Sequence, residues 1–188
     1  MKSQSYRSKS RSINRNDGTP NRQQHAVTRE AACKLSNEEQ LAGIKSLKEL
    51  EFLKVKGGLG KGAYGQVEMA VHVATGTKLA VKKIDKRSIA NKKIRATLMR
   101  EVEIHQRLYH ENIIRLYTWC EDSDFLYLIL EYAEGGNLFF YIRNTRKRLT
   151  EQETHRYFYQ TCSGIDFLHR NGLIHRDIKP ENLLLSPI

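Results

Sequence analysis

The sequence predicts an α+β fold in which a small antiparallel sheet with one helix precedes a mainly helical region. Residues 66–73 alternate apolar and polar side chains with the period of two that a half-buried strand shows, and residues 78–84 are expected to form a further strand. Residues 114–119 and 125–130 form a hairpin pattern, and residues 52–55 are expected to add one more short strand. The sheet should therefore have five antiparallel strands.

Apolar residues at helical spacing predict the helices that accompany and follow this sheet. The first stripe covers residues 94–108, between the third and fourth strands. Asn137 can cap a helix at 138–143, and a Thr-x-x-Glu capping box at 150–153 opens a helix that continues to His169. We expect the inward face of this last helix to hold four residues: Phe158, Cys162, Ile165 and Leu168.

Composition divides the chain into four parts. The first 50 residues contain ten Lys or Arg and five acidic residues, and they hold few apolar side chains that could offset the entropy of ordering them. We therefore expect a disordered basic tail at 1–35 and a linker at 36–50 with a short helix at 37–49. A sheet-containing lobe should then cover 51–131, and a hinge with a partial helical lobe should cover 132–188.

The composition also excludes several classes of protein. No apolar run reaches the roughly 18 residues that a membrane span needs, so we expect no membrane partner. Three widely spaced cysteines, Cys33, Cys120 and Cys162, fit neither a disulfide scaffold nor a zinc module. A reducing compartment is therefore expected, which places the chain inside the cell, in the cytoplasm or the nucleus. The net charge of +11 means that nucleic-acid binding has to be weighed.

The first motif that carries chemistry is a glycine-rich segment at 60–67. Glycines at its first, third and sixth positions would let backbone N–H groups approach a polyphosphate without side-chain collision. A strand pattern follows, whereas a dinucleotide-binding fold would place a helix there, and a Walker loop would end in Gly-Lys-Ser/Thr. On these residues alone, a simple glycine-rich turn between two strands is an equal alternative.

Two further positions suggest a charged pair near that segment. Ala80 and Lys82 share one face of the expected strand, so a small residue leaves room for a flat ring beside an ammonium group. Glu101 lies inside the apolar stripe of its helix, where a carboxylate is costly unless it is paired, and Lys82 is its natural partner. Taken singly, Lys82 is more commonly interpreted as an exposed strand lysine, which is what we expect for Lys83. Glu101, taken singly, is more commonly a glutamate on a helix surface.

The segment 175–182, with the sequence His-Arg-Asp-Ile-Lys-Pro-Glu-Asn, decides between these interpretations. It places a base, a cation and a metal-ligating amide within one short loop, a set that chance rarely produces. With this motif, the chain from about residue 51 to its end resembles a eukaryotic protein kinase domain of the serine/threonine type. The resemblance implies a kinase-like α+β fold that uses ATP and Mg²⁺ and phosphorylates serine or threonine hydroxyls of a protein substrate.

The resemblance also implies roles for individual residues. Gly60, Gly62 and Gly65 would cover the phosphates of ATP, and Lys82 would hold the α- and β-phosphates and pair with Glu101. The other implied ATP-binding positions are Leu59, Val67 and Ala80 around the adenine, Leu130 behind it, and Glu131 and Ala133 as hinge backbone partners. The implied catalytic positions are Asp177, which would accept the substrate hydroxyl proton, Lys179, which would steady the γ-phosphate, and Asn182, which would ligate magnesium.

Finer features are similar to particular branches of the family. Lys179, two residues after Asp177, resembles serine/threonine rather than tyrosine kinases. Arg176 beside Asp177 resembles kinases that are switched on by phosphorylation of an activation loop, because arginine can clamp a phosphate. Three segments are most similar to Aurora-type kinases and next to calcium/calmodulin-dependent kinases: 100–104, 110–117 and 127–133.

The chain departs from the family pattern in two respects. It ends six residues after Asn182, and it has no counterpart of the Asp-Phe-Gly motif, the activation loop or the later helices. We therefore expect a fragment with little or no activity of its own, whose helical region is marginally stable because its long helix lacks burying surface. Asn137 stands where kinases that prefer basic substrates often have an acid, whereas Glu181 retains the other typical acid.

Two functions of other classes stay open. A kinase-like lobe could bind nucleotide or a partner protein without transferring phosphate. The basic residues at 5–15 could contact nucleic acid, but Tyr6 is the only aromatic residue among them, so no stacking platform accompanies them. A solvated tail or a phosphorylation target is the preferred interpretation of this segment, and nucleic acid is not an expected partner.

Overall fold

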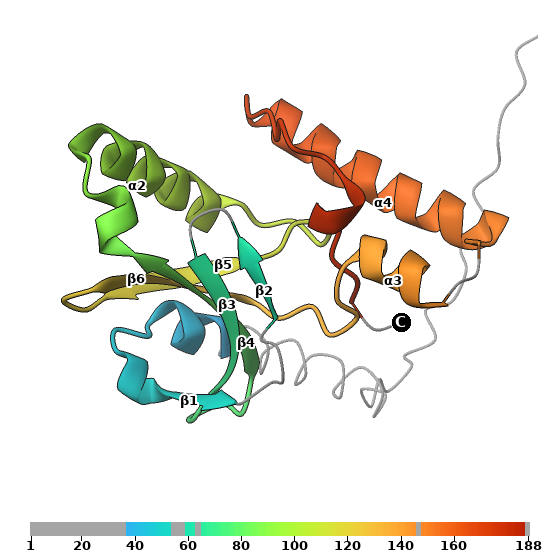
Figure 1. Cartoon of the computed structure of the whole chain (residues 1–188). Coiled ribbons are helices and arrows are strands. Elements are labelled where there is room, and N and C mark those ends of the chain that lie inside the picture. Colours follow the sequence, from blue (N-terminus) through green and yellow to red (C-terminus); the bar gives the residue numbers. More distant parts are fainter. Residues whose placement is uncertain (1–36, 54–58, 63–64, 146–147, 187–188) are drawn as a thin grey trace, which may run out of the picture. The chain divides into compact units, whose positions relative to one another are not determined.

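The central element is an antiparallel sheet in which five strands lie on one path, in the order β1-β3-β4-β6-β5 (Figure 1). The computed structural model describes residues 37–53, 59–62, 65–145 and 148–186. The five strands are β1 (Leu50–Leu53), β3 (Gly65–His72), β4 (Lys78–Asp85), β5 (Leu116–Glu121) and β6 (Phe125–Glu131). The prediction of a five-stranded antiparallel sheet is confirmed.

A sixth strand, β2 (Gly60–Gly62), pairs antiparallel with β3 beyond this path. The sequence had indicated only a glycine-dense turn here. The Gly-Lys-Gly sequence of β2 shows no alternation of apolar side chains, and the strand forms through backbone pairing that places Gly60 opposite Val67. The strand β5 also begins two residues later than expected and runs to Glu121. It ends where the Asp122 carboxylate accepts hydrogen bonds from the amides of the next residues and closes the turn.

The two faces of the sheet carry separate apolar clusters. One cluster joins the segment before the sheet to the strands, and its fully buried members include Leu41, Ile44, Leu79, Val81 and Ile129. The other joins the opposite face to helix α2 (Lys92–Arg107), and it contains Ile84, Ile89, Val102, Leu116, Leu126 and Leu128. In Figure 1, α2 and the segment that leads into β1 accordingly lie on opposite sides of the sheet.

The helix expected at 37–49 is wrong in its extent. Residues 37–42 are helical, but the helix ends at Gly43, and a separate 3-10 turn, η1 (Leu47–Glu49), follows. Ser46 caps that turn, and the Glu49 carboxylate accepts hydrogen bonds from the amides of Lys45 and Ser46, so this capping box restarts the chain in a new direction. The sequence at 36–39, Ser-Asn-Glu-Glu, also resembles a capping box, but Ser36 lies outside the described residues.

The helices expected after Asn137 and Thr150 begin where the sequence indicated, whereas α2 begins at Lys92, two residues before the expected stripe. Between β4 and α2, Asp85 caps a 3-10 turn, η2 (Lys86–Ile89), and Asn91 caps α2. Asn137 accepts a hydrogen bond from the amide of Phe140 in α3 (Leu138–Thr145). The capping box at 150–153 opens α4 (Glu151–Arg170), and the final turn is η3 (Pro180–Asn182).

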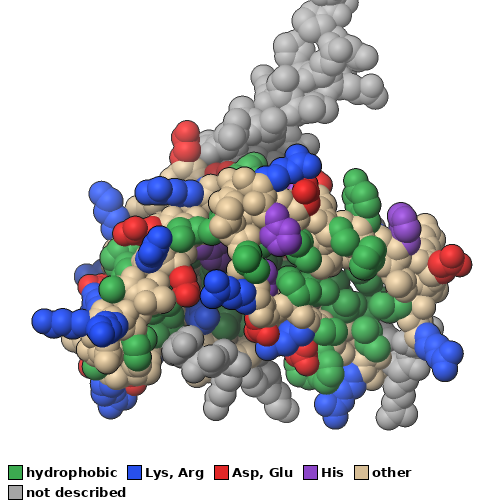
Figure 2. Space-filling model, turned by 90° about the horizontal axis from the view of Figure 1, so that it is seen from above, with side chains coloured by type: hydrophobic (Ala, Val, Ile, Leu, Met, Phe, Trp, Pro, Cys, Tyr) green, Lys and Arg blue, Asp and Glu red, His purple; other side chains and the backbone are tan. Residues whose placement is uncertain are grey.

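The inward face predicted for α4 is wrong in part. Ile165 and Leu168 are half-buried, but Cys162 is exposed and the Phe158 side chain is 70% exposed. The buried residue of α4 is instead Gly164, where an added Cβ would lie 3.0 Å from the carbonyl oxygen of Asn112. Figure 2 shows hydrophobic side chains gathered over the half of the molecule that α4 forms. None of the described helices combines the length and apolarity that crossing a membrane requires.

Candidate active site

The β2–β3 hairpin carries the glycines predicted to cover the phosphates. Gly60 pairs with Val67 and Gly62 pairs with Gly65, while the amide of Leu59 donates to the carbonyl oxygen of Val67 at 3.0 Å. The φ of Gly60 is +155°, a value that residues with a side chain rarely adopt. The structure therefore brings these five predicted residues into one hairpin, whose tip at residues 63–64 lies outside the described part.

Gly65 has a second role that the sequence did not reveal. A Cβ added to it would lie 1.8 Å from the carbonyl oxygen of Lys83, which belongs to the neighbouring strand β4. Because the obstacle is backbone in a sheet, it cannot move aside. Gly65 is thus required for the pairing of β3 with β4, independently of any phosphate.

Strand β4 presents Ala80 and Lys82 on the face that also bears the α2 cluster. Ala80 is 9% exposed and pairs with Leu130 of β6, and Lys82 is half-buried opposite Val67. The structure thus places a small side chain, an ammonium group and the predicted rear residue together, as expected. Burial lowers the pKa of Lys82, and the negative charge of Glu101 opposes this shift.

Lys83 points to the other face and is not the plain exposed lysine that we expected. Its Nζ lies 3.9 Å from the centroid of the Phe125 ring and 6.0 Å from that of Tyr127. This geometry is that of a cation–π contact. Lys83 therefore lies on the face of the sheet that bears Leu79 and Val81, here called the outer face, and Lys82 lies on the opposite face.

Glu101 lies in the middle of α2 and is exposed. Its negative charge opposes the effect of burial on the pKa of Lys82, but no ion pair joins the two side chains among the described residues. The close Lys82–Glu101 pair implied by the sequence is therefore not formed in this structure, although the two residues lie on facing elements.

The two residues predicted to form a hinge, Glu131 and Ala133, lie at the end of β6 and just after it. The amide of Glu131 donates to the carbonyl oxygen of Arg115 at 2.9 Å, and its carboxylate accepts a hydrogen bond from the amide of Arg115 at 3.0 Å. The amide of Ala133, in contrast, makes no hydrogen bond within the part of the chain that the structure describes. Ala133 therefore offers a donor for a ligand, whereas the amide of Glu131 is already used.

The three predicted catalytic residues form one interlocked set in the loop before and within η3. The Asp177 carboxylate contacts Lys179 Nζ at 2.9 Å through Oδ1 and Asn182 Nδ2 at 2.9 Å through Oδ2. Asn182 Nδ2 also donates to the carbonyl oxygen of Asp177 at 2.8 Å, and the amide of Asp177 donates to His175 Nδ1 at 3.2 Å. Arg176, between them, has a φ of +66°, which is uncommon for a residue with a side chain.

The electrostatics of this set favour an ionised aspartate. Hydrogen bonds from Lys179, and then from Asn182, hold the pKa of Asp177 below its ordinary value. The same contact with Asp177 raises the pKa of Lys179. Both side chains are largely exposed, at 60% for Asp177 and 47% for Lys179. At neutral pH the loop therefore presents a carboxylate that accepts and an ammonium that donates.

Asn182 also fits the magnesium role in its donor chemistry. Its Nδ2 is occupied by the two hydrogen bonds to Asp177, which leaves the amide oxygen Oδ1 without a bond among the described residues. Oxygen atoms are the ligands that Mg²⁺ prefers, and the ion usually keeps several waters and substrate phosphates besides one or two protein oxygens. No group of three or more His, Cys, Asp or Glu residues within the described ranges could hold a metal.

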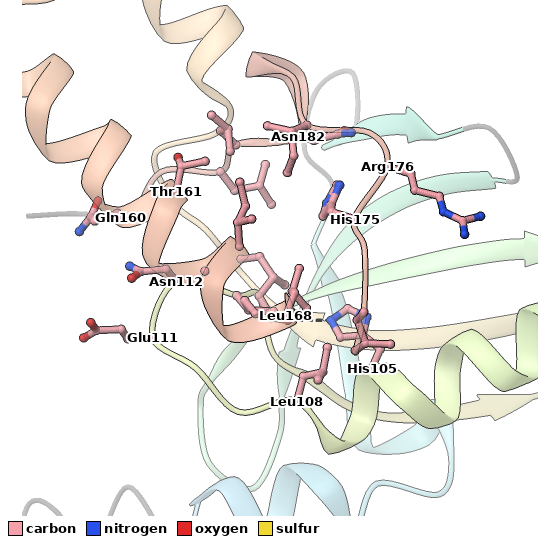
Figure 3. Close-up of a pocket in the computed structure, with 18 of the residues that line it drawn as sticks. His105, Leu108, Glu111, Asn112, Gln160, Thr161, Leu168, His175, Arg176 and Asn182 are labelled. Atoms are coloured by element: carbon pink, nitrogen blue, oxygen red, sulfur yellow. Dashed lines mark hydrogen bonds between the residues drawn. The ribbon is translucent and has the colours of Figure 1, made fainter. Parts of the chain in front are cut away.

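A cavity of about 1080 Å³ lies between α2, α4 and the segment 172–186 (Figure 3). Three residues of the predicted site line it: Glu101, Glu131 and Asn182. Lys82, Asp177, Lys179, Ala133 and the predicted adenine contacts Leu59, Val67 and Ala80 are not among its lining residues. The cavity thus adjoins the predicted site at α2 and the catalytic loop, and it does not coincide with the predicted nucleotide pocket.

Two residues near this cavity escaped the sequence reasoning. His105 follows Glu101 by one helical turn, and its Nε2 donates to the carbonyl oxygen of Ile114 at 2.8 Å, while burial lowers the pKa of His105. Arg115 donates from Nη1 to the carbonyl oxygens of Gln106 and Leu108, at 2.9 and 2.6 Å. Both side chains tie the end of α2 to the chain before β5. A histidine at helical spacing was the only available signal, and it is common in helices without a special role.

Comparison with known proteins identifies the family of this chain. The family model described as "Protein kinase domain" matches residues 53–187. The chain is 41% identical over 141 residues to an Aurora kinase of Candida albicans, covering 75% of this chain and 26% of that protein. It is 42% identical over 128 residues to an SNF1-related protein kinase catalytic subunit of Arabidopsis thaliana, covering 68% and 26%. The same identity and length relate it to calcium-dependent protein kinase 4 of Plasmodium berghei, covering 68% and 24%.

The chain belongs to the protein kinase family, since the family model covers well over half of its residues. The relatives include an Aurora kinase and a calcium-dependent kinase, the two branches that the motifs resembled, together with SNF1-related kinases. The chain spans about a quarter of the length of these three relatives.

Proposed function

We propose that this chain contributes the nucleotide site and the catalytic loop of an ATP-dependent serine/threonine protein kinase, with its two lobes divided near residue 131. The observation that carries the proposal is the interlocked set of Asp177, Lys179 and Asn182. One carboxylate oxygen contacts an ammonium group, the other contacts the amide nitrogen, and the amide oxygen stays available. This arrangement suits a loop that must hold a proton acceptor, a phosphate contact and a metal contact together.

In the proposed reaction, a serine or threonine hydroxyl of a protein attacks the γ-phosphorus of ATP. The bond from that phosphorus to the β–γ bridging oxygen breaks as the new O–P bond forms, and the hydroxyl proton passes to Asp177. The lowered pKa of Asp177 keeps it ionised and ready to accept this proton. Lys179 would contact the transferring phosphate, and Asn182 Oδ1 would hold Mg²⁺, which neutralises phosphate charge when it is bound.

The nucleotide would bind beside the sheet. Gly60, Gly62 and Gly65 of the hairpin would cover its phosphates, and Lys82 would contact the α- and β-phosphates. The adenine would lie among Leu59, Val67 and Ala80, with Leu130 behind it, and the free amide of Ala133 together with the backbone of Glu131 would recognise its edge. The support for this assignment is the shared hairpin, the small buried Ala80 and the unused donor at Ala133.

A second candidate is a module that binds nucleotide or a partner without transferring phosphate. The observation that favours it is the separation of Lys82 from Glu101, which form no ion pair among the described residues. In active kinases this pair must be in place before phosphoryl transfer. The two candidate functions share the nucleotide site. They differ in whether α2 can move so that the Glu101 carboxylate contacts the Lys82 ammonium.

Thermal-shift measurements on the full chain test the shared part. ATP at about 100 times its dissociation constant should stabilise the folded chain by about 2.7 kcal/mol. Lys82→Met should remove most of this effect, whereas the matched variant Lys83→Met, on the other face of the sheet, should retain it. Asn182→Ala should bind ATP but lose the additional stabilisation by Mg²⁺. If ATP stabilised the Lys82→Met variant as much as the unaltered chain, the proposed pocket would be refuted.

A phosphorylation assay then separates the two candidates. The full chain would be incubated with Mg-ATP and a mixed library of serine and threonine peptides. Label incorporation that Asp177→Asn abolishes would support phosphoryl transfer. Nucleotide binding without such incorporation would support the binding module.

We also propose a location within the cytoplasm or nucleus and a protein as the phosphate acceptor. The support for a reducing compartment is that Cys120, half-buried, and Cys162, exposed, are both free thiols. Cell fractionation with an antibody against the chain would test this location.

A further inference from the structure

Helix α2 has a small apolar contact with the sheet for a helix of 16 residues. Val102 is its only buried side chain, and Leu98 and Met99 pack against the same cluster half-buried. The hydrophobic contact is concentrated in the central part of the helix. The polar contacts at the two ends of α2 therefore do much to fix where the helix lies on the sheet. The interactions at one end are of a different type from those at the other.

The C-terminal end of α2 is held by hydrogen bonds to backbone. His105 Nε2 donates to the carbonyl oxygen of Ile114, and Arg115 Nη1 donates to the carbonyl oxygens of Gln106 and Leu108. These contacts are half-buried, and their acceptors are carbonyl oxygens of the main chain, which cannot rotate away as a side chain can. They make this end the fixed end of the helix.

At the N-terminal end of α2, the ion pairs to the sheet converge on one carboxylate. Glu121, the last residue of β5, contacts Arg95 Nη2 of α2 at 3.0 Å and Lys86 Nζ of η2 at 3.2 Å. The side chains of Glu121, Arg95 and Lys86 are 33%, 44% and 23% exposed, so the contacts are partly shielded from water. One acidic group thus joins the sheet, the 3-10 turn and the helix.

The charges around this end show why a carboxylate is needed there. The first turn of α2 contains no acidic residue, and Lys92, Lys93 and Arg95 lie next to the positive end of the helix dipole. Figure 2 shows Lys and Arg side chains gathered at its left margin, where α2 begins. Glu121 supplies the negative charge that the first turn of α2 lacks. The ammonium of Lys86, and then the guanidinium of Arg95, keep the pKa of Glu121 below its ordinary value.

We propose that Glu121 is a positioning residue that latches the N-terminal end of α2 to the sheet and so sets the distance between Glu101 and Lys82. The inference rests on the proposed function, since it gives that distance its importance. Glu101 lies about 9 Å along the helix from Arg107 and about 13.5 Å from Lys92, at 1.5 Å per residue. If α2 pivots on its fixed end, about 3 Å of movement at Lys92 moves Glu101 by about 1.2 Å.

The test is the pH profile of Lys82 acylation by a small amine-reactive reagent, measured by mass spectrometry on the full chain without nucleotide. Glu101→Gln should lower the pKa of Lys82, because it removes the charge that opposes burial. Glu121→Gln should lower it in the same direction by a smaller amount, on the order of 0.3 to 0.5 pH units. Asp124→Asn, which removes an equal charge from the same turn without touching α2, should leave it unchanged.

Arg95→Gln separates a latch from a direct field effect. It breaks the latch but removes a positive charge, so a field effect alone would raise the pKa of Lys82, whereas release of the helix lowers it. We expect Arg95→Gln and Glu121→Gln each to lower the pKa of Lys82. Neither should lower this pKa further when it is combined with Glu101→Gln. Opposite signs for the two variants, or no change in both, would overturn the latch. Because nucleotide is absent, failure of ATP to bind would count against the proposed function and leave this result standing.

Discussion

Residues 41–131 and residues 138–186 bury their side chains to very different degrees. The sheet region has a cluster on each face, with Leu79, Val81, Ile84, Leu116 and Ile129 fully buried. In the helical region, Leu138 is the only buried hydrophobic side chain of the described residues, and Phe158 and Tyr159 are 70% and 68% exposed. The proposed nucleotide contacts thus rest on packed strands, whereas the proposed catalytic residues depend on exposed hydrogen bonds. Local stability should differ accordingly.

The largest expected effect tests this contrast in packing. Ile129→Ala, in the centre of β6, should destabilise the fold by about 3 kcal/mol, because it leaves a cavity in a core that cannot collapse. Phe158→Ala removes a larger side chain from α4 but should cost less than about 1 kcal/mol, because that side chain already faces water. Urea denaturation of both variants gives the comparison. Equal costs would mean that the α4 face is covered in solution and that the contrast is false.

The next effect separates two glycines within the sheet region. Gly65→Ala should cost roughly 2 to 4 kcal/mol, because its Cβ would collide with the carbonyl oxygen of Lys83 and force β3 from β4. Gly60→Ala meets no atom and carries only the strain of its φ, so it should cost about 1 kcal/mol. The two variants, measured by the same denaturation, show whether backbone pairing or conformation sets the glycine requirement. A smaller cost for Gly65→Ala than for Gly60→Ala would contradict the packing argument.

Sequence patterns predicted what depends on neighbouring residues and missed what depends on docking. Strand β3 followed from alternation, and α4 followed from its capping box, since both signals are local. The exposure of Phe158 was missed because periodicity shows that a helix has an apolar face without showing what covers it. The loop holding Asp177 and Asn182 was predictable as a unit because its members are close in sequence.

The separation of Lys82 from Glu101 could not be predicted in the same way. It depends on how α2 sits on the sheet, and that position is set by contacts between residues distant in sequence, such as Arg95 with Glu121 and Arg115 with Gln106. Such contacts leave no period and no motif. A resemblance to a family supplies the expected pair but not the position of the helix in this chain.

The third effect is a pH dependence confined to the catalytic loop. The folded pKa of Asp177 is depressed, so its contribution is present above the ordinary aspartate pKa and is lost as the pH falls through the folded value. Acidification should therefore release Lys179 and Asn182 while the amides of Val81 and Ile129 in the sheet keep their protection. NMR chemical shifts and hydrogen exchange, followed from about pH 5 to pH 2, measure both regions together.

Variants assign the cause of that shift. Lys179→Met should raise the pKa of Asp177 most, since the contact with Lys179 is its main cause, and Asn182→Ala should raise it by less. Arg170→Met is a suitable control, because Arg170 forms its own exposed ion pair with Asp166 on α4. If the loop lost its structure at the same pH in Lys179→Met and in the unaltered chain, the ionised Asp177 would not be what stabilises it.

The smallest effect tests whether the outer face of the sheet relies on more than burial. The Lys83 ammonium lies over the Phe125 ring at 3.9 Å, and Phe125 also packs against the apolar cluster on that face. Replacing Phe125 by Leu keeps an apolar side chain but removes the ring quadrupole, so the coupling energy between the two residues should be about 0.5 to 1 kcal/mol. A double-mutant cycle with Lys83→Met isolates this term from the lost volume. Coupling near zero would mean that the ammonium is solvated above the ring, and that the sheet region owes its stability to its two clusters alone.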